Sequence, residues 1–181
     1  MPISIGSVVR IGIFLVGSYG IVRLSLPSLR DPRSHGFYRF FAFESLLALL
    51  LMNIPAWFHN PISPSQLMSW ILLMASAILA IHGFAILRGR GRPSASFETT
   101  TVLVTSGLYR YIRHPLYASL LYFGWGVFLK QPLPIPAVLT AAASVMLFLT
   151  ASSEERENLS KFGADYADYI KKTRRFIPFI F

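Results

Sequence analysis

The residues best suited to chemistry fall in two polar segments of an otherwise apolar chain. The first segment, residues 101–117, reads TVLVTSGLYRYIRHPLY and contains an arginine next to a histidine. The second, residues 153–181, reads SEERENLSKFGADYADYIKKTRRFIPFIF and begins with two adjacent glutamates after a serine. A guanidinium can bind a carboxylate through two parallel hydrogen bonds, and a carboxylate can bind an ammonium group or accept a proton. If the fold brings these segments together, they can bind and orient a charged organic molecule.

Metal chemistry, thiol chemistry and a Rossmann-type nucleotide site are not expected. The 181 residues include no cysteine, which excludes a disulfide, a thiolate metal ligand and a cysteine nucleophile. The four histidines lack the spacing of metal ligands, so we predict no metal site. The GRGR sequence at residues 89–92 follows no predicted strand and lacks a third spaced glycine, which argues against a nucleotide-binding Rossmann domain.

The rest of the chain predicts membrane-spanning helices. Apolar residues make up 54% of the sequence, charged residues 14%, and the mean hydropathy is +0.53, as is typical of an integral membrane protein. We predict an all-α integral membrane fold with about five transmembrane helices, in one membrane domain covering residues 1–181. Residues 1–98 would supply three spans and a loop, and residues 99–181 a helical hairpin and a tail. The expected spans are residues 7–26, 40–58, 66–87, 115–130 and 133–151.

The last two spans should place the polar segments side by side. Only a few residues separate these spans, so they are expected to form an antiparallel hairpin. Arg113 and His114 should then lie close to Glu154 and Glu155, although the two pairs are far apart in the sequence. The fourth span is short, and we expect it to continue a turn upstream. Its two glycines are expected to face the alanines of the fifth span and to allow close helix packing.

The tail after the fifth span predicts a cytoplasmic, amphipathic C-terminal helix. Leu159, Phe162, Tyr166, Tyr169 and Ile170 recur at helical spacing, with charged residues between them. A helix of this kind suits the bilayer surface or the mouth of a pocket.

The basic residues predict the orientation of the chain. Fifteen of the 17 lysines and arginines fall on one side of the expected spans, the side of the two polar segments. By the positive-inside rule, the N-terminus is outside or lumenal, and the C-terminus and polar segments are cytoplasmic. The membrane would be a plasma membrane or endoplasmic reticulum, depending on the host. This charge suits anionic membrane lipids, and nucleic acid is not expected as a partner.

Single residues also have simpler interpretations. Arg113 alone could reach the headgroups as a topology residue, and the glutamates could be solvated acids at a helix start. Tyr109 could belong to an interfacial aromatic belt. Glu44 and His82 lie within spans, where ionisable groups are often functional. Alternatively, Glu44 pairs with Arg39 near the interface, and His82 is a buried neutral imidazole.

The motifs of the two segments are specific when taken together. In order, they are Gly-x-Tyr, Arg-His-Pro-x-Tyr, Glu-Glu, Gly-x-x-Tyr-x-x-Tyr and a late Ile-Pro. In this order, after a predicted hairpin, they make the chain resemble the isoprenylcysteine carboxyl methyltransferase family. More broadly, the chain resembles the membrane methyltransferases that include phospholipid N-methyltransferases. The likeness covers residues 103–121 and 154–180.

The resemblance implies an S-adenosylmethionine site at the cytoplasmic end of the hairpin, and a lipophilic substrate that enters from the bilayer. Arg113 and Glu155 are the candidate catalytic residues. An apolar and aromatic wall suits the adenine, a carboxylate suits the cofactor's amino group, and the amides after Pro115 suit its carboxylate. Ser119 stands where the family usually has glycine, which bears on substrate fit. The matching cofactor-binding positions are Thr101, Val102, Leu103, Val104, Tyr109, His114, Pro115, Leu116, Tyr117, Glu154 and Glu155.

The substrate decides whether a base is needed. A carboxylate, with a pKa of about 3.5, is already ionised, so methyl transfer to it needs orientation, for which Arg113 is the candidate. The ammonium group of phosphatidylethanolamine must first lose a proton, which Glu154, Glu155 or His114 could accept. We expect carboxyl methylation of a prenylated cysteine, with phospholipid N-methylation as the alternative. A nicotinamide-dependent membrane reductase and a non-catalytic membrane protein are alternatives of other classes.

Overall fold

The computed structural model describes residues 4–91 and 101–178, and within these ranges every regular element is a helix. The prediction of an all-α fold is confirmed. Residues 92–98 of the predicted loop and residues 179–181 of the predicted tail lie outside the described ranges. The elements are α1 (Ile5–Leu29), α2 (His35–Asn53), η1 (Ile54–Ala56), α3 (Pro64–Arg90), η2 (Gly107–Arg110), α4 (Pro115–Phe128), α5 (Pro134–Phe162) and α6 (Ala164–Lys172).

Serine or proline marks the start of each long helix. The side chains of Ser4, Ser34 and Ser63 accept a hydrogen bond from the backbone amide three residues later, which satisfies one of the free donors at a helix start. The helices α4 and α5 instead begin with Pro115 and Pro134, whose fixed φ and missing N–H suit the first turn. Local sequence thus sets where the hairpin helices begin.

Four helices are long and apolar enough to cross a membrane: α1, α2 with η1, α3 and α5. The fourth expected span is the exception, because α4 has only 14 residues, about 21 Å of helix against a hydrocarbon core of about 30 Å. The expectation that it continues upstream is wrong. His114 has φ −124° and ψ 63°, outside the helical region, so the helix begins at Pro115.

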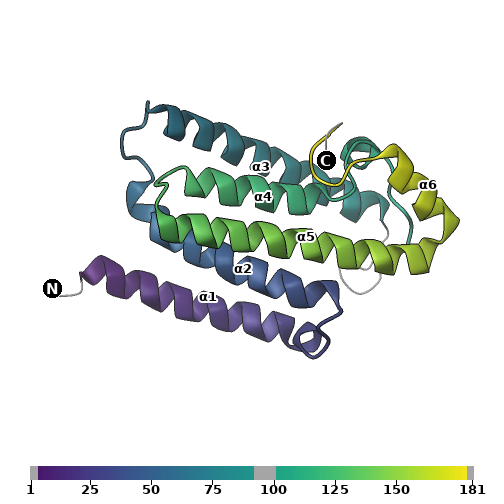
Figure 1. Cartoon of the computed structure of the whole chain (residues 1–181), viewed down its shortest axis with the longest axis horizontal. Coiled ribbons are helices and arrows are strands. Elements are labelled where there is room, and N and C mark those ends of the chain that lie inside the picture. The colour runs from purple at the N-terminus through teal and green to yellow at the C-terminus, as the bar shows by residue number, and fades with distance from the viewer. Residues whose placement is uncertain (1–3, 92–100, 179–181) are drawn as a thin grey trace.

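The helix α4 lies between α3 and α5, and α1 lies at the edge of the bundle beside α2 (Figure 1). The two glycines of α4 do not face α5 as predicted. A Cβ on Gly124 would lie 2.9 Å from Leu46 of α2, and one on Gly126 would lie 3.2 Å from the carbonyl oxygen of Ser69 in α3. The Ser69 hydroxyl donates a 2.6 Å hydrogen bond to the Gly126 carbonyl. The glycines therefore allow α4 to sit deeply between α2 and α3.

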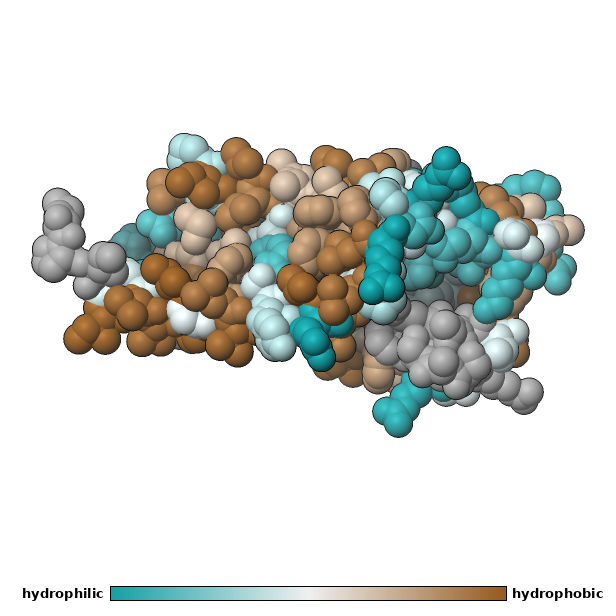
Figure 2. All heavy atoms as spheres, turned by 90° about the horizontal axis from the view of Figure 1, so that it is seen from below, coloured by the Kyte–Doolittle hydropathy of each residue, from teal (hydrophilic) through white to brown (hydrophobic). Residues whose placement is uncertain are grey.

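One end of the bundle is polar and the rest of its surface is largely apolar. In Figure 2, brown residues cover most of the bundle, and teal residues gather at the end that carries α6. The apolar part of α5 ends near Ala151, and the turns that follow carry Glu154 and Glu155. We call this end, with α6 and the last three turns of α5, the polar end.

A buried lysine joins three segments at the opposite end. Lys130, only 4% exposed, donates a 3.0 Å hydrogen bond to the side-chain oxygen of Gln66. Its ammonium lies 3.4 Å from the ring centroid of Trp70 and 5.3 Å from that of Trp57. The Gln66 amide in turn donates to the carbonyls of Ala56 and Lys130. This arrangement ties the end of α4 to η1 and to the start of α3.

Replacing Lys130 with methionine should lower the free energy of unfolding by about 2 kcal/mol. The change removes a desolvated cation–π contact and leaves the Gln66 oxygen without its donor. The measurement is thermal unfolding in detergent, with the exposed Lys171→Met as the matched control. Equal unfolding temperatures for the two variants would show that the buried lysine contributes nothing.

Candidate active site

The backbone before α4 is held by the C-terminal strap, which we define as residues 173–178. The amides of Arg113 and His114 donate to the carbonyls of Arg174 and Arg175, at 2.7 and 3.2 Å. The Arg174 amide donates back to the Tyr111 carbonyl at 3.0 Å, completing a short parallel bridge. The strap therefore fixes the backbone that presents Arg113 and His114.

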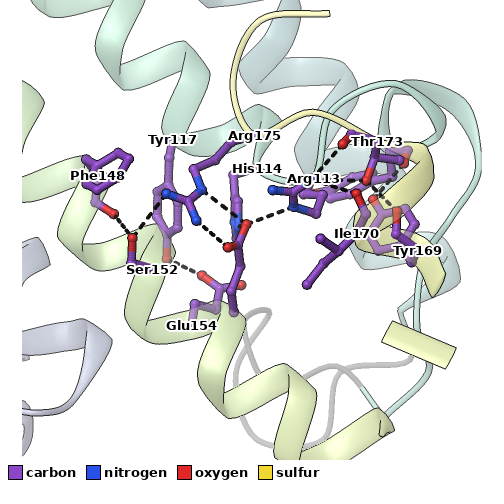
Figure 3. A network of polar contacts seen from close by, with 12 residues as sticks. Arg113, His114, Tyr117, Phe148, Ser152, Glu154, Tyr169, Ile170, Thr173 and Arg175 are labelled. Carbon is purple, nitrogen blue, oxygen red and sulfur yellow. Dashed lines mark hydrogen bonds and ion pairs between the residues drawn. The ribbon is translucent and has the colours of Figure 1, made fainter. Parts of the chain in front are cut away.

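Glu155 lies at the centre of a cluster with three basic side chains, which we call the Glu155 cluster. Its carboxylate accepts hydrogen bonds from Arg113 Nε at 2.8 Å and Arg175 Nε at 3.2 Å, and His114 Nε2 lies 3.3 Å away. Figure 3 shows Arg113 and Arg175 approaching from opposite sides. The prediction that the Arg-His pair meets the Glu-Glu pair is confirmed.

The Glu155 carboxyl stays ionised at neutral pH. Burial, at 7% exposure, would by itself raise its pKa, but hydrogen bonds from His114, Arg175 and Arg113 outweigh burial and hold the pKa far below its usual range. The carboxylate is therefore fixed as an ion-pair partner and is a poor proton acceptor near pH 7.

The stabilising effect of this ionised carboxylate should depend on pH only in acid. Because the pKa is lowered in the folded state, the contribution is complete above the unfolded pKa of about 4.3 and is lost as the pH falls further. The difference in unfolding temperature between wild type and Glu155→Gln should be constant from pH 8 to 5.5 and narrow below about pH 4.5. Thermal unfolding of both proteins, measured from pH 8 to below about pH 4.5, checks this pH dependence. Narrowing above pH 6 would mean that Glu155 titrates there.

Arg113 has two of its three nitrogens engaged within the protein. Besides the bond to Glu155, its Nη1 donates to the carbonyls of Thr173 and Ile170 at 2.7 and 3.3 Å, at the end of α6. Within the described ranges, Nη2 makes no hydrogen bond. The predicted role in orienting a carboxylate therefore rests on Nη2.

Two adjoining cavities open beside the cluster at the polar end, one of about 220 Å³ and one of about 50 Å³. We call them together the polar-end cavity. Nine of the twelve predicted site residues line it. They are Leu103, Val104, Tyr109, Arg113, His114, Pro115, Leu116, Tyr117 and Glu154.

The other three predicted residues lie outside the lining. Thr101 and Val102 are exposed beside the end of α3, where the Thr101 amide donates to the Gly91 carbonyl at 3.0 Å. Glu155 is directed into the ion-pair cluster instead, because successive residues of a helix project about 100° apart. Of the adjacent glutamates, Glu154 therefore faces the cavity.

Glu154 is held by a neighbouring tyrosine. The Tyr117 hydroxyl donates a 2.6 Å hydrogen bond to its carboxylate, and the Tyr117 ring stacks on His114 with centroids 5.5 Å apart.

Burial, and then the Glu154 charge, raise the pKa of Tyr109 well above its usual value, so this phenol stays neutral. The Tyr169 hydroxyl from α6 donates to the Tyr109 carbonyl at 2.6 Å. The amphipathic α6 thus packs over the cavity, as one of its two predicted placements proposed.

Further lining residues were not predicted. Asn158 and Lys161 lie four and seven residues after Glu154 on α5, and this helical spacing could have identified them. His35 and Glu157 form an ion pair at 2.7 Å on the cavity rim. No sequence pattern indicates that contact, because it joins residues 122 positions apart.

The ionisable residues within the spans lie away from this cavity. Glu44 accepts a 2.9 Å hydrogen bond from Ser18 of α1, which is a different partner from the predicted Arg39. His82 is exposed on α3, with Nδ1 3.0 Å from the Ile78 carbonyl, so the expectation of a buried imidazole is wrong. Ser119 is buried against α3 and its hydroxyl donates to the Leu116 carbonyl, so it does not line the cavity either.

The described lining combines apolar and charged groups. Leu103, Val104 and Tyr109 supply apolar and aromatic surface, and Glu154 supplies a carboxylate. Within residues 4–91 and 101–178, no group of acidic or histidine residues is arranged to hold a metal ion.

The described chain is a bundle of helices that are apolar enough to span a membrane, with a charged cavity at one end, as in an integral membrane protein that binds a polar ligand. The sequence model of the phospholipid methyltransferase family matches residues 64–164, more than half of the chain, and includes α3, α4 and α5. The chain therefore belongs to this family of methyltransferases.

Individual relatives agree with the resemblance to isoprenylcysteine methyltransferases. Over 81 residues, the chain is 41% identical to protein-S-isoprenylcysteine O-methyltransferase of Tribolium castaneum, covering 44% of this chain and 28% of the relative. It is 32% identical to the Dictyostelium discoideum protein of the same name over 73% of this chain and 60% of the relative. Methanethiol S-methyltransferase 2 of Bradyrhizobium diazoefficiens is 27% identical over 76% of this chain and 58% of the relative. The chain thus spans less than two thirds of the length of each of these relatives.

Proposed function

We propose that the protein transfers a methyl group from S-adenosylmethionine to the carboxylate of a prenylated cysteine, with the polar-end cavity as its active site. The observation that carries this proposal is the convergence of both polar segments on one cavity, which Arg113 and Glu154 line together. The names of the insect and slime-mould relatives support the substrate class.

Each part of the cofactor has a matching group in the cavity. When bound, S-adenosylmethionine supplies an electrophilic methyl carbon. Leu103, Val104 and Tyr109 provide an apolar wall for the adenine, and the Glu154 carboxylate accepts hydrogen bonds from the amino group. The amides of the first turn after Pro115 suit the cofactor's carboxylate. Tyr117 keeps Glu154 in this orientation.

The protein's task toward the substrate is orientation. The carboxylate of a prenylated cysteine is ionised at neutral pH and needs no base. Arg113 Nη2 can bind it, while Glu155 and Thr173 hold the rest of the guanidinium still. The prenyl chain remains among the spanning helices, and the polar end faces the cytoplasm.

A second candidate is methylation of an amine or thiol. The family's description names a phospholipid, such as phosphatidylethanolamine with its amine, and the name of the bacterial relative names a thiol. The cavity lining favours it in one respect, because Glu154 and Glu157 provide carboxylates, and His35 an imidazole, that could accept the proton such nucleophiles must lose.

The deciding experiment offers methyl-labelled S-adenosylmethionine and one acceptor at a time to the detergent-solubilised protein. The acceptors are a farnesylated cysteine, phosphatidylethanolamine and methanethiol, and the product is treated with alkali. We expect label on the farnesylcysteine that alkali releases as methanol, as from a carboxyl ester. Alkali-stable label on the lipid, or a volatile labelled thioether from methanethiol, would establish the second candidate instead.

A further inference from the structure

An apolar groove lies between α1 and α2 at the end of the bundle opposite the polar end. Its volume is about 440 Å³. Helix α1 lies at the edge of the bundle and packs mainly against α2 (Figure 1), so this groove opens to the surroundings of the bundle. Ser7 and Arg10 supply its polar lining, and the other five lining residues are apolar. We call these apolar residues the floor of the groove; they are Ile11, Phe14, Ala48, Leu51 and Met52.

Arg10 is a cation without an acidic partner in the described chain. Its Nε donates to the Gly6 carbonyl and its Nη2 to the Ser7 hydroxyl, both at 3.2 Å and both within its own helix. Within residues 4–91 and 101–178, no carboxylate forms an ion pair with Arg10. Glu44 of α2, four residues before the lining residue Ala48, accepts a hydrogen bond from Ser18 instead. Among the described lysines and arginines at this end, the other one is Lys130, which is buried.

The groove extends along part of one leaflet of a bilayer. The α1 residues that line it run from Ser7 to Phe14, a rise of about 10 Å along the helix, and half of the hydrocarbon core is about 15 Å. Arg10, in the second turn of a membrane-spanning helix, then lies near the headgroups of that leaflet. A ligand that complements both features carries an anion at one end and a hydrocarbon chain at the other.

We propose that this groove binds an anionic phospholipid of the leaflet opposite the polar end. The phosphodiester accepts hydrogen bonds from the Arg10 guanidinium, with the Ser7 hydroxyl beside it, and one acyl chain lies along the apolar floor. An anionic headgroup is favoured over a zwitterionic one, because the site carries a single positive charge and no carboxylate to receive an ammonium. The lipid then fills the space between α1 and α2 and stabilises the attachment of α1.

The test is native mass spectrometry of the detergent-purified full chain titrated with phosphatidylglycerol, compared with diacylglycerol of the same chains. We expect one tightly retained phosphatidylglycerol, an affinity roughly fivefold lower in Arg10→Gln, and a comparable loss in Ala48→Phe, which fills the floor. Arg23→Gln, near the other end of α1, is the matched control and should keep this binding.

Every other pattern overturns the proposal. Equal phosphatidylglycerol affinity in wild type and Arg10→Gln would show that Arg10 binds no phosphate. Equal affinity for diacylglycerol would show that the groove holds a chain without recognising a headgroup. A loss in Arg10→Gln without a loss in Ala48→Phe would place the lipid outside the groove.

Discussion

Replacing Glu155 with alanine should lower the free energy of unfolding by roughly 3–5 kcal/mol, the largest stability effect expected of a single side chain in this protein. The change leaves the side chains of Arg113, Arg175 and His114 close together without their shared anion. It also loosens the C-terminal strap, because Arg175 anchors that segment to α5. Methyl transfer should be lost with it, since the strap orders the backbone that carries Arg113.

Thermal unfolding in detergent, followed by circular dichroism, measures this effect. Asp168→Ala is the matched control, because Asp168 is exposed and pairs with Lys171 on the surface of α6, so its loss should cost little. If Glu155→Ala unfolds at the same temperature as Asp168→Ala, the cluster does not hold the polar end together.

Exchanging Arg113 for lysine should lower kcat/KM for a carboxylate substrate by roughly 10- to 100-fold. Lysine keeps the charge, but one ammonium cannot replace the planar guanidinium, whose Nε and Nη1 bind Glu155 and Thr173 while Nη2 remains for substrate. The affinity for S-adenosylhomocysteine should change much less, because that ligand relies on other residues of the cavity.

Arg175→Lys separates orientation of the substrate from support of the fold. Arg175 binds the same Glu155 carboxylate but does not line the polar-end cavity. Both variants should unfold at a lower temperature than wild type, and only Arg113→Lys should show the large fall in kcat/KM for the carboxylate substrate. Equal losses of kcat/KM in the two variants would assign Arg113 a supporting role alone.

Most of the fold follows from local sequence, and so does the meeting of the two polar segments. Apolar runs of sufficient length predict α1, α2, α3 and α5, and a short connection between α4 and α5 is enough to bring Arg113 to Glu155. The partners of α4 could not be predicted in this way. The glycines of α4 are compatible with any close neighbour, and only the packed bundle shows that they face α2 and α3.

The site differs from the sequence-based prediction in two other respects. These are the direction in which each glutamate points and the contacts made by residues from distant segments. Helical geometry requires Glu154 and Glu155 to face different ways, but the sequence does not say which of them faces the cavity. His35 reaches the rim from the first turn of α2, and Arg175 reaches the cluster from the strap. Both contacts depend on tertiary packing between segments that share no sequence pattern.

The most direct test of the central claim is the affinity for S-adenosylhomocysteine, measured by isothermal titration calorimetry on wild type, Glu154→Gln and the surface control Asp168→Asn. The claim is that the polar-end cavity holds the cofactor and that Glu154 receives its amino group. It predicts saturable binding to wild type, a dissociation constant at least about tenfold higher for Glu154→Gln, and an unchanged value for Asp168→Asn. Unchanged affinity in a folded Glu154→Gln protein would contradict this placement of the cofactor.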